Sequence, residues 1–170
     1  MWIIVSGMSS NSGGLDSRVR IGHVHLKVSN LDRSLQFYCG ILGFELQQKF
    51  GGQAAFISAG GYHHHIGLNT WESLGGLPPP SGRTGLYHVA ILYPTRATLG
   101  SAVRRVLDAG HELEGAADHG VSEAIYLRDP DQNGLELYRD RPEPEWPRDE
   151  LGKLAMYTRP LDLAGLLASA

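Results

Sequence analysis

The chain has 170 residues, of which 42% are hydrophobic and 19% are charged, and its formal net charge is −3. This composition is typical of a globular protein, and the length fits one domain or two small repeats that share a core. The sequence contains no lysine- or arginine-rich stripe, which argues against nucleic acid or a membrane surface as a partner. Cys39 is the only cysteine, so no internal disulfide can form, and a reducing, cytoplasmic location is expected.

Residues 1–20 are predicted to form a disordered lead. The first residues are apolar, but no basic segment precedes them, so neither a signal peptide nor a transmembrane span is expected. Residues 9–17 are rich in Ser, Gly and Asn, a composition that is typical of disorder. Met8 is an alternative start.

The first repeat, residues 21–72, begins with “IGHVHLKVSN”, whose alternation predicts a strand with His23 and His25 on one face. “LDRSLQFYCGILG” has apolar residues at helical spacing and ends at Gly43, a residue suited to a helix C-terminus. The apolar runs “FELQQKF”, “QAAFISA” and “YHHHIGLNTW” follow. The repeat therefore has the order strand, helix and three strands.

The second repeat, residues 85–140, has the same order. “GLYHVAILYP” predicts its first strand, and “TRATLGSAVRRVLDAG” predicts a helix that ends at Gly110. “HELEGAADHG”, “EAIYLRDP” and “NGLELYRD” predict three strands. Residues 73–84 form a Gly- and Pro-rich linker that is too short to separate independent domains. Residues 141–170 are expected to form an extended tail, in which “PLDLAGLLASA” suggests a short helix.

Overlaying the repeats pairs His23 with His88 and Gly67 with Glu136. One repeat alone would leave a sheet face bare, so the two are expected to pack as one α+β domain with pseudo-two-fold symmetry. The four paired positions should then converge near the axis. Two imidazoles and one carboxylate suit Fe(II) or another divalent ion and leave sites open for substrate and dioxygen. The ordinary alternatives are packing histidines and an exposed edge-strand carboxylate.

The stretches “IGHVHLKVSNLDRSLQFYCGILGFEL”, “YHVAI” and “YLRDPDQNGLELY” resemble the vicinal oxygen chelate superfamily. Its members include glyoxalases, epimerases, fosfomycin-resistance enzymes, bleomycin-binding proteins and extradiol ring-cleaving dioxygenases. The resemblance covers roughly residues 20–140. It implies two βαβββ repeats that form one half-open, barrel-like mixed sheet around a metal. By position it assigns the metal ligands to His23, His88 and Glu136.

The motifs are most similar to those of the extradiol dioxygenases. The glyoxalase branch usually has a carboxylate ligand where this chain has Gly67, whereas the dioxygenases use two histidines and one glutamate. The segment “DHGVSEAIYLRDPDQNGLELY” resembles the end of their catalytic module and implies catalytic roles for His119 and Tyr126. Tyr126 would donate a hydrogen bond in the pocket. The alternatives are an exposed loop residue for His119 and plain strand packing for Tyr126.

The same resemblance implies a histidine that handles protons without binding the metal, just before Gly67. The family pattern favours His64, whereas strand alternation favours His65, which would share a face with Gly67. Both remain candidates for the catalytic residue, and His63 is expected to be exposed. His25, two residues after His23, should face the same pocket and contact the substrate.

The expected function is extradiol ring cleavage of a catechol or related vicinal dihydroxy compound, with dioxygen as the second substrate. Fe(II) is the expected metal, and Mn(II) or another divalent ion is the alternative. A homodimer is expected because the half-open sheets have edges to cover. Many extradiol enzymes carry a second pair of repeats that this chain lacks. An isomerase, lyase or thiol transferase therefore stays open, as does a protein that only sequesters a small molecule.

Overall fold

The computed structural model describes residues 14–170. The expected disordered lead falls mostly on residues 1–13, which lie outside the described residues together with the alternative start at Met8. Residues 14–23 contain a turn but no strand or helix. None of the helices in residues 14–170 has the length and apolar character needed to cross a membrane.

The first repeat forms a four-stranded mixed sheet with a helix on one face. Its elements are β1 (Val24–Lys27), α1 (Leu31–Leu35), a π-helical turn (Gln36–Ile41), β2 (Glu45–Phe50), β3 (Ala54–Ser58) and β4 (Ile66–Asn69). The Asn30 side chain caps α1 by accepting a hydrogen bond from the Arg33 N–H. Gly43, at φ 90°, follows the helical segment, as the sequence predicts. The strand order is β1-β4-β3-β2, and β1 runs parallel to β4.

The second repeat has the same plan and gains one strand from the tail. Its elements are β5 (Val89–Leu92), α2 (Arg96–Asp108), β6 (Leu113–Asp118), β7 (Ser122–Arg128) and β8 (Gly134–Asp140). The tail adds a 3-10 turn (Glu143–Glu145), β9 (Arg159–Pro160) and α3 (Leu163–Ala168). The strand order is β5-β8-β7-β6-β9, with β5 parallel to β8. The predicted βαβββ repeats are therefore confirmed, as two open sheets.

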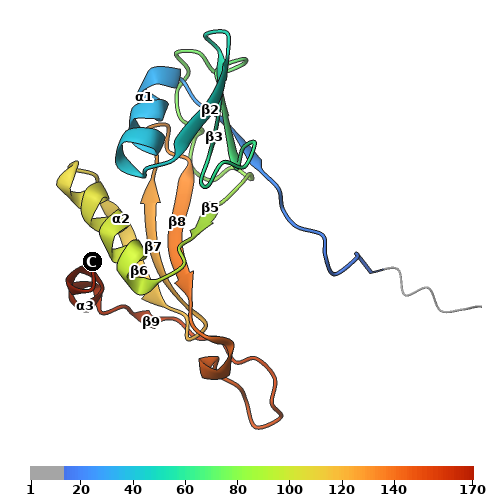
Figure 1. Ribbon diagram of the computed structural model, residues 1–170, viewed down its shortest axis with the longest axis vertical. Helices are drawn as coiled ribbons and strands as arrows, with labels where there is room; N and C mark the ends of the chain where they lie inside the picture. Colours follow the sequence, from blue (N-terminus) through green and yellow to red (C-terminus); the bar gives the residue numbers. More distant parts are fainter. Residues whose placement is uncertain (1–13) are drawn as a thin grey trace, which may run out of the picture.

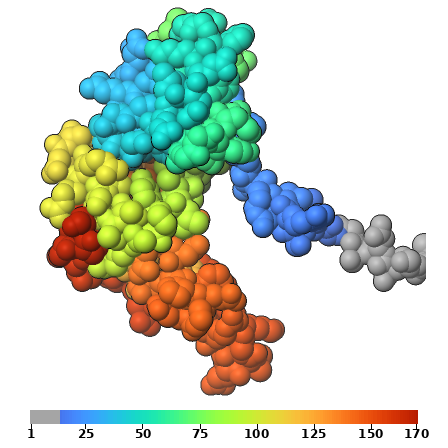
Figure 2. Space-filling model, in the orientation of Figure 1, coloured from blue at the N-terminus to red at the C-terminus, as the bar shows by residue number. Residues whose placement is uncertain are grey.

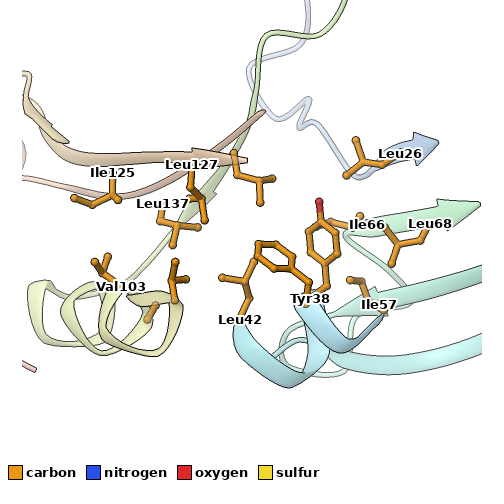
Figure 3. Packing of buried hydrophobic residues seen from close by; sticks show 14 of the residues in the cluster. Leu26, Tyr38, Leu42, Ile57, Ile66, Leu68, Val103, Ile125, Leu127 and Leu137 are labelled. Atoms are coloured by element: carbon orange, nitrogen blue, oxygen red, sulfur yellow. The ribbon is translucent and has the colours of Figure 1, made fainter. Parts of the chain in front are cut away.

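One hydrophobic core joins the two repeats. Figure 3 shows Tyr38 and Leu42 between side chains of the first sheet (Ile57, Ile66 and Leu68) and of the second repeat (Val103, Leu127 and Leu137). The Tyr38 hydroxyl also donates a hydrogen bond to Asp129 at 2.9 Å, in the turn between β7 and β8. Because these contacts are buried, the repeats are held in one fixed arrangement.

In that arrangement α1 and α2 lie on the same side of the sheets (Figure 1). The Arg105 side chain of α2 donates to the carbonyl of Ile41 at 2.9 Å, so the two helical segments are neighbours. The outline is elongated, with the first repeat at one end and the tail segment before β9 at the other, whereas α3 lies beside α2 (Figure 2). Both sheets therefore bury the face that meets the helices, and their opposite faces carry the polar and aromatic side chains described next.

Candidate metal centre

The open face of the first sheet carries a cluster of three histidines. His23 immediately precedes β1, His25 lies on β1, and His64 lies two residues before β4. One ring nitrogen from each of the three lies within 4.8 Å of the other two. The His64 ring centroid is 4.3 Å from that of His23 and 5.8 Å from that of His25. Three close imidazoles in this geometry are able to contact one ion or one small ligand.

His64 is the member of the histidine run that faces this cluster. Its Nε2 atom is buried and has no hydrogen-bond partner among the described residues. Burial, with the neighbouring His23, His63, His25 and His65, lowers the pKa of His64. A buried nitrogen without a protein partner is uncommon, and water, an ion or a ligand can supply the missing contact.

His63 and His65 are not members of this cluster. His63 is exposed and its Nδ1 lies 2.8 Å from the Nδ1 of His64. The Nδ1 of His65 accepts a hydrogen bond from the Ala59 N–H at 3.3 Å, and its ring packs on Tyr62. Strict alternation would have placed His65 beside Gly67. It does not apply here, because β4 begins at Ile66 and the run lies in a bend before the strand.

The Gly67 position is covered by the ring of His25. The two residues pair directly across β1 and β4, and a Cβ atom on Gly67 would lie 2.6 Å from His25 Cε1. The His25 ring also packs against Phe56 at 5.8 Å and stacks on Trp71 at 6.1 Å. A carboxylate side chain at position 67 would therefore have no room to act as a fourth ligand while His25 keeps this position. The side chains around Gly67 are aromatic instead.

The open face of the second sheet carries a histidine and a carboxylate in contact. His88, just before β5, places its Nε2 2.9 Å from Oε2 of Glu136 on β8. Two ligands bound at about 2.1 Å and at right angles would lie about 3 Å apart, so this spacing suits a shared divalent ion. The Glu136 side chain is only 13% exposed. The distance is also that of a direct His–Glu hydrogen bond, and as donors the two side chains suit a divalent ion.

Tyr126 and His119 extend this group along the sheet. Tyr126 pairs with Glu136 across β7 and β8, and its hydroxyl lies 3.4 Å from Oε1 of Glu136. Burial raises the pKa of Tyr126, and the Glu136 carboxylate raises it further, so the phenol stays protonated. His119, in the turn between β6 and β7, places Nε2 2.7 Å from the Tyr126 hydroxyl. The four side chains of His88, Glu136, Tyr126 and His119 form one connected row.

The two groups lie on different sheets. Among the described residues, only His23, His25 and His64 form a set of three ligand residues whose donor atoms all lie within 4.8 Å. His23 is therefore not within that distance of both His88 and Glu136 in a single chain. Each sheet presents its group on the face opposite the helices, in agreement with the alternation of buried and open residues along the strands.

Several residues of this region were not identified from the sequence. Phe56 and Trp71 line the His25 side of the site, and Tyr157 and Thr158 of the tail contact His119. A period-two reading of β3 would have placed Phe56 opposite Gly67, because the two pair in the sheet. No local sequence pattern predicts the contacts of Tyr157 and Thr158 with His119, because these residues are far apart in the chain.

Comparison with known proteins identifies the family of the chain. Residues 20–137 match the family described as “Glyoxalase/Bleomycin resistance protein/Dioxygenase superfamily”. The chain belongs to this superfamily, as the sequence motifs predicted.

Two curated relatives are dioxygenases by name. The chain is 45% identical to the catechol-2,3-dioxygenase of Bacillus subtilis (strain 168) over 150 residues, which are 88% of this chain and 52% of that protein. It is 32% identical to biphenyl-2,3-diol 1,2-dioxygenase 3 of Rhodococcus globerulus, over 71% of this chain and 63% of that protein. The chain thus spans about half to two thirds of the length of these relatives.

The fold recurs in solved structures. A glyoxalase/dioxygenase from Nostoc punctiforme superposes with a TM-score of 0.61 at 19% identity, over 76% of this chain and all of that one. This likeness concerns the fold alone. The dioxygenase relatives and the histidine cluster together indicate a divalent metal.

Proposed function

We propose that the protein cleaves the ring of a catechol or a related vicinal dihydroxy compound in an extradiol reaction that consumes dioxygen. The observation that carries this proposal is the contact between His88 Nε2 and Glu136 Oε2, next to the Tyr126–His119 pair. The names of two relatives, a catechol-2,3-dioxygenase and a biphenyl-2,3-diol 1,2-dioxygenase, support the substrate class. We propose His23, His88 and Glu136 as ligands of Fe(II), with Mn(II) as the alternative.

A bound Fe(II) would supply the Lewis acidity that lowers the pKa of a catechol hydroxyl and the redox activity that dioxygen chemistry needs. The chain's own residues orient the substrate and move protons. His64, whose Nε2 is buried beside His23, would take a proton from the substrate and return it. The rings of Phe56 and Trp71, which pack on His25, offer an aromatic substrate a flat apolar wall.

Purified protein loaded anaerobically with Fe(II) is expected to turn catechol yellow on exposure to air, because ring fission gives a conjugated product. Absorbance of that product and oxygen uptake measure the reaction, and the Zn(II)-loaded protein is the control that binds a metal without redox activity. If the Fe(II)-loaded protein consumes no oxygen with catechol, 3-methylcatechol or biphenyl-2,3-diol, the proposed ring cleavage is contradicted.

We also propose that the chain functions as a homodimer in which two copies complete each metal centre. His23 would come from the first sheet of one copy, and His88 with Glu136 from the second sheet of the other. The position of these residues on two different sheets supports this proposal. The described helices cover the other side of both sheets, so the faces that carry the proposed ligands are open to a second copy.

The exposed apolar side chains of the open faces support the same pairing. Ala90 on β5 pairs with Glu136. Leu92, two residues further along, lies on the same side of β5 as Ala90 and is 54% exposed. Trp71 beside His25 is 52% exposed, and Tyr87 beside His88 is 79% exposed. A second copy would cover these side chains by placing one open face against the other, in a two-fold arrangement that forms two equal sites.

Complementation distinguishes a shared centre from a centre within one chain. His23→Ala and His88→Ala chains, coexpressed with two different tags and isolated as the mixed dimer, are expected to hold about half of the wild-type metal, since one of two shared sites is intact. Each variant alone should hold almost none. The control pairs wild type with the double variant His23→Ala/His88→Ala, and a shared centre predicts no intact site there. Metal in this control dimer with none in the dimer of the two single variants would contradict the shared centre. A monomer at micromolar concentration would contradict it as well.

A further inference from the structure

The tail after β8 returns to the turn that carries His119. β9 pairs with the end of β6, through Arg159 opposite Asp118. The Tyr157 N–H donates to the carbonyl of His119 at 3.3 Å. The Tyr157 ring packs so closely on Gly120 that a Cβ atom there would lie 2.7 Å from the ring. Gly120 also has a φ of 78°, which favours glycine, so this turn accepts the tail only with this residue.

The tail also contacts the imidazole of His119 itself. Nδ1 of His119 lies 3.2 Å from the carbonyl oxygen of Tyr157 and 3.2 Å from Oγ1 of Thr158. A carbonyl oxygen only accepts hydrogen bonds, so this contact requires the proton of the neutral ring to be on Nδ1. The other nitrogen, Nε2, is then an acceptor and faces the Tyr126 hydroxyl at 2.7 Å.

The direction of this bond fixes the orientation of the Tyr126 hydroxyl. The phenol has one hydrogen, and its distance to His119 Nε2 is 2.7 Å against 3.4 Å to Glu136 Oε1. With the imidazole proton on Nδ1, Nε2 can only accept, so the hydroxyl hydrogen lies in this contact and not in the longer one to Glu136. Tyr126 therefore points its hydrogen away from Glu136 as long as the tail holds His119 in this tautomer. The residues that set this orientation lie beyond residue 137, where the family match ends.

We propose that Tyr157 and Thr158 are positioning residues of the active site: they hold the proton of His119 on Nδ1, so that Nε2 accepts the hydroxyl hydrogen of Tyr126. Their effect on turnover rests on the proposed ring cleavage, whereas their effect on the tautomer does not. The outer partners of metal-bound histidines fix the tautomer and ring orientation, and their loss typically lowers activity about 10- to 100-fold. We expect an effect at the lower end of that range at His119, which contacts Tyr126 and not the metal.

The direct test reads the tautomer by ¹⁵N NMR of the imidazole nitrogens in the full chain loaded with diamagnetic Zn(II). Comparison with His119→Gln assigns the resonances. The wild type is expected to show a protonated Nδ1 and an unprotonated Nε2. Thr158→Val, which keeps the side-chain shape but loses the hydroxyl, should shift the Nδ1 resonance. Thr158→Ser should restore it. Tyr157→Ala, which removes the ring that packs on Gly120, tests the carbonyl contact.

Turnover of the Fe(II)-loaded variants gives the second readout. Thr158→Val is expected to lower kcat about tenfold with KM and metal content close to wild type. Met156→Ala is the matched control, because Met156 is an exposed neighbour in the same segment. A wild-type His119 protonated on Nε2 would overturn the proposal, as would unchanged His119 resonances in both Thr158→Val and Tyr157→Ala. If the wild type cleaves no catechol, the proposed function fails, and the NMR result still decides the positioning role.

Discussion

Glu136→Gln is expected to lower the affinity for Fe(II) by more than about 100-fold, because losing a residue that only orients a metal ligand already costs about 10- to 100-fold. Glutamine keeps the shape of the side chain but loses the charge that Fe(II) requires. His88→Ala and His23→Ala should have the same effect. Elemental analysis and metal titration followed by competition with a chelator measure the loss. Ring cleavage should fall in parallel when the metal is not in large excess.

Glu114→Gln is the matched control for this prediction. Glu114 lies on β6 of the same sheet, but its carboxylate pairs with Arg128 at 2.9 Å and its side chain is half-exposed. An exposed ion pair contributes about 0–1 kcal/mol to stability, so this variant should fold and hold metal like the wild type. If Glu136→Gln and His88→Ala bind Fe(II) as tightly as Glu114→Gln does, the ligand assignment is wrong.

The repeat and its elements could be predicted from the sequence because their signals are local. The alternation around His23 and the helical spacing that ends at Gly43 depend only on neighbouring residues, and the structure places β1 and the helical segment there. The family resemblance, and not alternation, assigned Tyr126 to the same pocket as Glu136, and the two residues pair directly across β7 and β8.

The relation between the two sheets could not be predicted in this way. Symmetry within the sequence pairs His23 with His88, but it does not determine whether their sheets face each other within one chain. That depends on long-range packing, in which Tyr38 lies between the repeats and bonds Asp129. This packing places both helices on one side and leaves the proposed ligands on the open faces. The tail contacts with His119 are long-range in the same sense.

The run of three histidines shows where alternation fails. His65 was a candidate because residues two apart on a strand share a face, but β4 begins only at Ile66. In the bend before the strand, the backbone N–H of Ala59 binds His65, and His64 turns towards His23 instead. The local conformation of three residues therefore determines which histidine faces His23.

His64→Ala is accordingly expected to lower kcat for catechol about 100- to 10,000-fold, the usual effect of losing a positioned proton-transfer group. Metal content and catechol affinity should stay close to wild type, because His64 is not one of the three proposed ligands. Single-turnover and steady-state kinetics of the Fe(II)-loaded variant, with elemental analysis of the same sample, separate these effects.

His65→Ala is the matched control, since it changes the same residue type one position away. The His65 ring contacts Ala59 and Tyr62 and does not belong to the cluster around His23. Substitutions outside the site usually change stability by about 0.5 kcal/mol or less, so this variant should turn over catechol almost normally. His63→Ala removes the contact with His64 Nδ1 at 2.8 Å and should lower kcat by less than His64→Ala does. A loss of turnover in His65→Ala with a normal His64→Ala would reverse the assignment. If all three variants turn over catechol normally, the proton-transfer group must be His119 or His25, which border the two halves of the site.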